Sequence, residues 1–243
     1  MNQYLYKFNQ YVGALLGTDD PQGNSQENRG KIHHDKSIRE AGEKLESEHL
    51  PIKNRVRAAH DLGVLAYTGG YEGGTLTTEY IPIMLQLLSH PDVSDEHLIP
   101  LLEGLASLWH AQLANQAKAC QLGASATLMD IISPECSRSD LVKRWACYAL
   151  DMLCINNVPN MRVLVTMPHL QAHLEAAAAL DWAWWPKNHA AVLLKVLGFW
   201  PSDTEEPVTE EGGGDQVEME DETEREGKTE EEDGGHNTIP EED

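Results

Sequence analysis

The sequence predicts an all-α fold, a short right-handed α-solenoid of helical repeats followed by a disordered acidic tail. Strand-like alternation of apolar and polar residues is absent from residues 31–200, and runs of β-branched residues are rare there. Apolar residues recur instead at i, i+3 and i+6, which is a helical spacing. These apolar runs repeat along the chain with a period in the low forties, which is typical of stacked helical repeats.

Two independent series of apolar runs carry this period. The first series is centred on a leucine and recurs at intervals of 43, 45 and 44 residues, at Leu62, Leu105, Leu150 and Leu194. The second series lies between these runs and recurs at intervals of 44 and 42 residues, at Leu88, Ile132 and Leu174. The agreement predicts about three to four units. It also predicts that Leu105 and Leu150 are fully buried where each unit packs on the next.

The central unit shows how a repeat divides into helices. Gly123 inside one long helix over residues 115–134 would cost about 1 kcal/mol relative to alanine. We therefore expect Gly123 to separate a first helix at 115–122 from a second helix at 125–132. Pro134 then follows the end of the second helix, where a helix cannot continue.

The third helix of this unit falls in the stretch "SRSDLVKRWACYALDMLC". Ser137 or Ser139 is positioned to cap its start, with Asp140 near the positive end of the helix dipole. If Leu150 points toward the core, the helical spacing predicts that four more side chains point inward with it, namely those of Ala146, Cys147, Leu153 and Cys154. The opposite face is apolar and aromatic, which is unusual for a surface that only meets water, and it consists of Leu141, Trp145, Tyr148 and Met152.

Residues 115–154 resemble an armadillo repeat, with Asn115, then Gly123, an L-x-x-I-I run and a third helix with A-L-x-x-L spacing. The resemblance extends over about residues 50–200 and includes "YIPIMLQLLSHP" as the second helix of a preceding repeat. Glu79 and Val165 stand where the neighbouring units would carry the glycine, so a less regular, HEAT-like array is the alternative. The resemblance implies an adaptor or scaffold that presents a ladder of third helices to an extended peptide or a partner helix.

The aromatic face of the third helices is the candidate partner site. We place the centre of this site at Trp145, Tyr148 and Met152, and we extend it to Leu141, Trp185 and His189. In peptide-carrying armadillo proteins, the positions that match Tyr148 and Met152 hold a Trp and an Asn that grip a basic extended chain. No unit of this chain carries that Asn, so the resemblance does not extend to the binding of nuclear signals.

Residues 1–16 and 17–30 precede the repeat body. The first segment places its apolar residues on one helical face, at Tyr4, Phe8, Tyr11, Val12 and Leu15. A membrane-surface helix would carry basic residues opposite that face, and only Lys7 is available, so we expect this helix to dock on the body. It could cover the aromatic face, which is the alternative to an open partner groove. Residues 17–30 are polar and contain glycine, which predicts a flexible linker.

Charge is distributed unevenly between the body and the tail. Of the 40 acidic and 18 basic residues, 19 acidic and 2 basic residues follow Pro201, so the body at 31–200 is only mildly acidic. Residues 201–243 are acidic and lack aromatic residues, which predicts a disordered tail. Three roles are open for this tail: it solubilises the chain, it attracts a basic partner, or it folds back on the body. No broad basic face is available for phosphates, so we do not expect nucleic acid as the main partner.

The sequence offers little for catalysis or for small ligands. The cysteines form no C-x-x-C pair and are expected as free thiols, at Cys120, Cys136, Cys147 and Cys154. His169 and His173 would share a helical face, but no third ligand is visible, so we expect no metal and no cofactor. The glycine-rich residues 68–75 lack the lysine of a phosphate loop, and no small-molecule ligand is expected.

We therefore expect a non-catalytic scaffold for protein partners, in the cytoplasm or alternatively in the nucleus. No signal peptide and no apolar run of about 18 residues is present, so no membrane span is expected. Two competing classes are an enzyme that uses a cysteine with a histidine, or the His169/His173 pair, and a structural subunit of a larger assembly. An enzyme would need a reactive group, its base and an orienting group within reach in one cleft.

Overall fold

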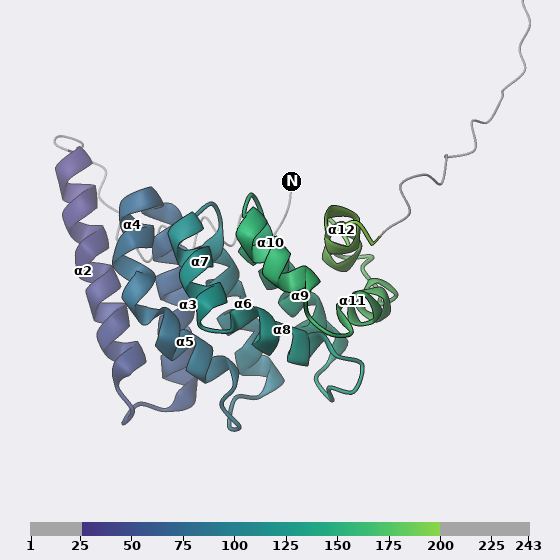
Figure 1. Cartoon of the computed structure of the whole chain (residues 1–243). Coiled ribbons are helices and arrows are strands. Elements are labelled where there is room, and N and C mark those ends of the chain that lie inside the picture. Colours follow the sequence, from purple (N-terminus) through teal and green to yellow (C-terminus); the bar gives the residue numbers. More distant parts are fainter. Residues whose placement is uncertain (1–25, 200–243) are drawn as a thin grey trace, which may run out of the picture. The chain divides into compact units, whose positions relative to one another are not determined.

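The computed structural model describes residues 26–199 (Figure 1), and every regular element in this range is a helix. The all-α prediction is therefore confirmed for this part of the chain. The expected helix at 1–16 and the acidic tail at 201–243 lie outside the described residues. Helix α2 begins at Gln26, so the last five residues of the expected linker at 17–30 are helical. Polar composition alone does not end a helix whose later turns pack on the body, as those of α2 do.

The helices follow one another in three similar units after an opening pair. The opening pair consists of α2 (Gln26–Glu46) and α3 (Ile52–Thr68). The first unit consists of α4 (Gly70–Thr77), the 3₁₀ turn η1 (Thr78–Tyr80), α5 (Ile81–Leu88) and α6 (Asp95–Trp109). The second consists of α7 (Leu113–Gln121), α8 (Ala124–Ile132) and α9 (Asp140–Cys154). The third consists of α10 (Val158–Val165), α11 (Leu170–Ala178) and α12 (His189–Val196).

Equivalent helices of successive units lie against one another. The third helices pack in chain order, α3 on α6, α6 on α9 and α9 on α12. The first helices do the same, α4 on α7 and α7 on α10, and Figure 1 shows these three side by side. Because the first and third helices each pack on their counterparts one unit away, the packing of the helices repeats with the period of the sequence.

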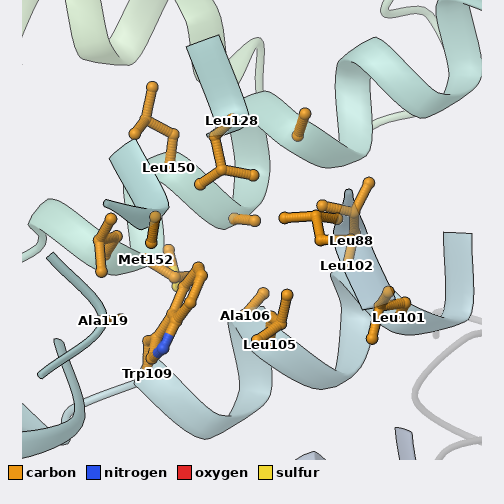
Figure 2. Close-up of a cluster of buried hydrophobic side chains, with 14 of the residues drawn as sticks. Leu88, Leu101, Leu102, Leu105, Ala106, Trp109, Ala119, Leu128, Leu150 and Met152 are labelled. Atoms are coloured by element: carbon orange, nitrogen blue, oxygen red, sulfur yellow. The ribbon is translucent and has the colours of Figure 1, made fainter. Parts of the chain in front are cut away.

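Both series of apolar runs lie in the hydrophobic core, as predicted. Leu105 and Leu150 have no exposed surface, and the remaining members of the two series are also buried. Figure 2 shows Leu105 beside Ala106 and Trp109 on α6. Leu128 and Leu150 of the following unit lie in the same cluster of buried side chains. The core is therefore continuous between the first and second units.

Two glycines allow α3 and α6 to approach closely. A Cβ atom added to Gly63 would lie 2.0 Å from the carbonyl oxygen of Gly104, and one added to Gly104 would lie 2.7 Å from the Cα of His60. Both distances are too short for any side chain, so the two backbones touch at this crossing. These glycines determine how tightly the opening pair packs on the first unit.

The helix break at Gly123 is confirmed. Helix α7 ends at Gln121, α8 begins at Ala124, and Gly123 between them has a φ of +85°, which glycine adopts without strain. In the next unit the left-handed position is His169, with a φ of +60°, directly before α11. The prediction that Val165 is the equivalent of Gly123 was therefore wrong, because Val165 is still the last residue of α10. In the first unit no left-handed residue is needed, since η1 continues from α4 into α5.

Candidate functional site

Helix α9 carries the candidate site on the face opposite the core. The inward set is confirmed, because Ala146, Cys147, Leu153 and Cys154 are all buried with Leu150. On the other face, exposure falls along the helix, from Leu141 at 40% through half-buried Trp145 and Tyr148. Ser139 is the N-cap residue, but its side chain accepts no capping hydrogen bond.

Met152 departs from the expected groove. Its side chain is buried rather than exposed, and Figure 2 shows it beside Trp109 and Ala119. The reason is that α7 packs against α9, and Gln116 on α7 donates to the backbone carbonyl of Met152 at 2.9 Å. The end of α9 is therefore covered by the chain itself, and Met152 is a core residue.

Five rings from α9, from the connection after α11 and from α12 form an aromatic cluster, namely Trp145, Tyr148, Trp182, Trp185 and His189. The ring centroids of Trp145 and Trp185 are 5.0 Å apart, and those of Tyr148 and His189 are 4.8 Å apart. Both pairs meet edge to face, which is a favoured geometry for aromatic rings. The cluster thus brings together four of the six predicted site residues and adds Trp182.

The connection at 179–188 is held in place by hydrogen bonds to both flanking helices. Trp182 donates its indole N–H to the carbonyl of Ala177 at 3.0 Å. Asn188 donates to the carbonyl of Ala178 at 2.9 Å, and its side-chain oxygen caps the start of α12. Arg144 on α9 donates to the carbonyl of Asp181. These contacts give the connection a defined shape without a regular element.

Trp184 lies in this connection and is 91% exposed. A fully exposed indole is uncommon, because it leaves a large apolar surface in water. The helical spacing could not find Trp184, since the residue belongs to no helix. The available signal was the stretch "WAWW", with three tryptophans in four positions.

A buried polar contact anchors the aromatic cluster to α9. His189 is buried, and its Nδ1 lies 2.8 Å from Oδ2 of Asp151 on α9. Burial, together with the nearby carboxylates of Asp151 and Glu103, raises the pKa of the Tyr148 hydroxyl. His189 therefore supports the cluster and offers little surface of its own, whereas Trp145, Tyr148 and Trp185 are half-buried.

Residues 6–201 match the family described as Armadillo-like helical domain-containing protein 2. The chain belongs to this family. The match includes every helix described above, and the predicted resemblance to armadillo-like helical domain proteins is thereby confirmed. A search of curated proteins returned no match.

Armadillo-like helical domains commonly act as protein-interaction scaffolds and are generally not enzymes. In this armadillo-like domain, Cys147 and Cys154 face the core. Burial raises the pKa of the Cys154 thiol to about 12, and burial also raises the pKa of the Cys147 thiol. Thiols in such surroundings stay protonated and are poor nucleophiles.

His169 and His173 do lie together, with ring centroids 6.0 Å apart. In the part of the chain that the structure describes, no group of three His, Cys, Asp or Glu residues could hold a metal ion. A shallow cavity of about 350 Å³ beside α11 is lined by His169 and Glu175 but by no cysteine. This cavity therefore does not bring a cysteine together with His169 and Glu175. Among the described residues, no helix has both the length and the apolar character that a membrane crossing requires.

Proposed function

We propose that this protein is a non-catalytic interaction scaffold whose units stack into a short right-handed solenoid. A peptide or a partner helix would lie along the aromatic cluster and contact Trp184. The observation that carries the proposal is this arrangement of rings, in which a tryptophan that is 91% exposed stands on a connection held by hydrogen bonds.

Tryptophan and tyrosine are the residues that most often anchor protein interfaces. An indole has few rotatable bonds, so its burial by a partner costs little conformational freedom. We assign the direct contacts to Trp184, Leu141 and the exposed edges of Trp145, Tyr148 and Trp185. Met152 and His189 lie beneath them and act only through packing.

A protein partner fits this surface better than a nucleic acid or a small molecule. The surface is built of aromatic rings, and the carboxylates of Asp151 and Glu103 near Tyr148 oppose the charge of Arg144, so the surface offers no broad basic face for phosphate groups. The four cysteines are free thiols, which suits a reducing compartment. We therefore place the protein in the cytoplasm, with the nucleus as the alternative.

The test uses exposed residues, because truncating Trp145 or Tyr148 would also remove packing within the cluster. The full chain and a Trp184→Ala, Leu141→Ala variant are compared by quantitative affinity purification from cell extract. We expect the variant to retain at least about tenfold less of the specifically bound partner than the full chain does, which corresponds to the loss of one interface anchor. The melting temperature should stay within a degree or two, since neither side chain is buried.

Leu122→Ala is the matched control. Leu122 is 44% exposed, close to the 40% of Leu141, but it lies at the end of α7, outside the cluster. This control should bind partners as the unaltered chain does. Equal retention of partners by the control and by the Trp184→Ala, Leu141→Ala variant would overturn the proposal.

A further inference from the structure

A second apolar surface lies along one edge of the helical units, where each third helix ends and the next first helix begins. Five large side chains there are between 38% and 79% exposed, and we call them the edge strip: Tyr67, Tyr71, Leu113, Ile155 and Val158. They make up a large share of the exposed large hydrophobic residues in the described chain. Surfaces of this kind mark places where something docks.

The strip is built by repetition. Tyr71, Leu113 and Val158 stand at the start of α4, α7 and α10, the three first helices that lie side by side in Figure 1. Tyr67 and Ile155 stand at the ends of α3 and α9. The strip therefore extends across three consecutive first helices.

Hydrogen bonds between units fix the strip in position. Gln112, directly before α7, donates to the carbonyl of Gly70 at the start of α4 at 2.8 Å. Asn160 at the start of α10 donates to the carbonyl of Gln116 on α7 at 3.1 Å. The exposed side chains are thus held on a rigid base, as a docking surface requires.

Helix α2 begins at this same edge. Nε2 of His34 on α2 lies 3.1 Å from Oγ1 of Thr68, the last residue of α3. At the other end, Arg55 near the start of α3 donates to the carbonyl of Leu45 near the end of α2 at 2.9 Å, so the two helices are antiparallel. Gln26 lies eight residues before His34, about 12 Å further along the axis. The chain before α2 therefore enters the fold at the edge that carries Tyr67 and Tyr71.

The segment that precedes α2 has the matching chemistry. The family match begins at residue 6, so it includes most of the segment.

We propose that residues 1–16 lie across the edge strip with their apolar face against Tyr71, Leu113 and Val158. The strip begins beside α3, the helix on which α2 packs. The third helices pack in the order α3, α6, α9 and α12, with about 10 Å between the axes of neighbouring helices. The aromatic cluster lies on the last two of these helices. The segment therefore reaches the strip first, and it leaves the aromatic cluster open. This inference stands independently of the proposed function.

The test is cross-linking within the full chain by a short bismaleimide. Cys120 and Cys136, the two cysteines that are not buried, are first changed to serine. Tyr11→Cys is then paired with Leu113→Cys in one variant and with Val196→Cys in the control. Leu113 and Val196 are equally exposed, at 56% and 55%, but Val196 lies on α12, away from the strip. We expect at least about tenfold more intramolecular product with Leu113→Cys.

Each other outcome overturns the proposal in a different way. Equal yields with Leu113→Cys and Val196→Cys would mean that the segment does not dock. A product that joins two chains would assign the strip to a second copy. A higher yield when Tyr11→Cys is paired with Trp184→Cys would move the segment to the aromatic cluster.

Hydrogen exchange supplies a readout that needs no added cysteine. Tyr11→Asp places a charge on the apolar face of residues 1–16, whereas Tyr6→Asp places the same charge on the opposite face. We expect Tyr11→Asp to speed amide exchange about tenfold at the starts of α4, α7 and α10, with exchange in α12 unchanged. Tyr6→Asp should leave all four helices as they are. Equal effects of the two variants would refute the docking of residues 1–16 on the strip.

Discussion

Asn115 and Asn160 perform the same task in successive units. Asn115 donates to the carbonyls of Leu108 and Gly74, and Asn160 donates to those of Leu153 and Gln116. Leu108 and Leu153 lie in the last turns of α6 and α9, where carbonyls have no partner within the helix. Each asparagine thus satisfies the end of one helix and also ties its own unit to the preceding one. Both side chains are buried, so water cannot replace them.

Replacing Asn160 should therefore be costly. Asn160→Ala leaves the carbonyl of Leu153 without a donor and removes a second donor from the carbonyl of Gln116, and we expect the free energy of unfolding to fall by about 1–3 kcal/mol. Urea unfolding measures this change. Asn54→Ala, at an exposed position on α3, is the control and should change stability by less than about 0.5 kcal/mol. A cost at Asn160 no larger than that of the control would mean that the buried hydrogen bonds contribute nothing.

The raised pKa of Asp61 on α3 predicts that the stability of the protein depends on pH. Burial raises the pKa of its carboxyl to about 6, although Arg57 lies 3.5 Å away. A carboxyl with a raised pKa in the folded protein binds its proton more tightly there than in the unfolded chain. Its contribution to stability is therefore present at low pH, and it is lost as the pH rises from about 4 to about 6. Asp61→Asn should consequently be more favourable, relative to the unaltered chain, at pH 7.5 than at pH 4.5. Urea unfolding of both proteins at the two pH values tests this, and a difference that does not change with pH would contradict it.

At the scale of elements, the contacts between helices decide the fold more than the helices themselves. Most of the described helices have fewer than ten residues, which is too short for stability in isolation. The crossing of α3 and α6 shows what replaces intrinsic stability, because Gly63 and Gly104 let the two backbones touch. This close contact gives the adjacent apolar side chains their dense packing.

Gly104→Ala should disturb this crossing. The added methyl group would lie 2.7 Å from the Cα of His60 and 2.9 Å from the carbonyl oxygen of Ala59, so α3 must shift. We expect a loss of about 1–3 kcal/mol, even though alanine is the better helix former. Thermal unfolding measures the loss, with Ser107→Ala on the same helix as the control. If Gly104→Ala raised the melting temperature, helix propensity would outweigh the contact, and the crossing would be looser than described.

At the scale of the whole molecule, one arrangement of units creates two different surfaces. The stacked third helices place the aromatic cluster at α9 and α12, and the starts of the first helices build the edge strip. The two surfaces share no residue. The two proposed occupants, a partner at the aromatic cluster and residues 1–16 at the strip, would therefore not compete for the same side chains.

The acidic tail should not be required for this arrangement. Ending the chain at Pro201 removes 19 acidic and 2 basic residues and leaves every described helix intact. Because this removes much of the negative charge, we expect an unchanged or slightly higher melting temperature. Circular dichroism and thermal unfolding of the shortened chain check this. Helical signal lost beyond the change in length would show that the tail supports the fold.

Much of the architecture could be predicted from the sequence alone. The helical class, the repeat period, the buried leucines such as Leu105 and Leu150, the break at Gly123 and the inward face of α9 all follow from local spacing. Spacing determines these features because a helix turns a fixed angle per residue, so a repeated apolar position must return to the same face. Four of the six predicted site residues meet in the aromatic cluster, but Trp185 belongs to no helix, and hydrogen bonds from the connection to the flanking helices set its position.

Only the tertiary structure decided what happens where distant segments meet. Met152 has the spacing of a surface residue, but α7 covers it, and His189 is buried against Asp151. Trp184 is exposed because hydrogen bonds hold a connection that has no periodicity. The edge strip likewise exists only because three helix starts, far apart in the chain, are stacked on one edge. Burial is a property of neighbours in space, and a single sequence states the period of a helix but not which other helix comes to lie on it.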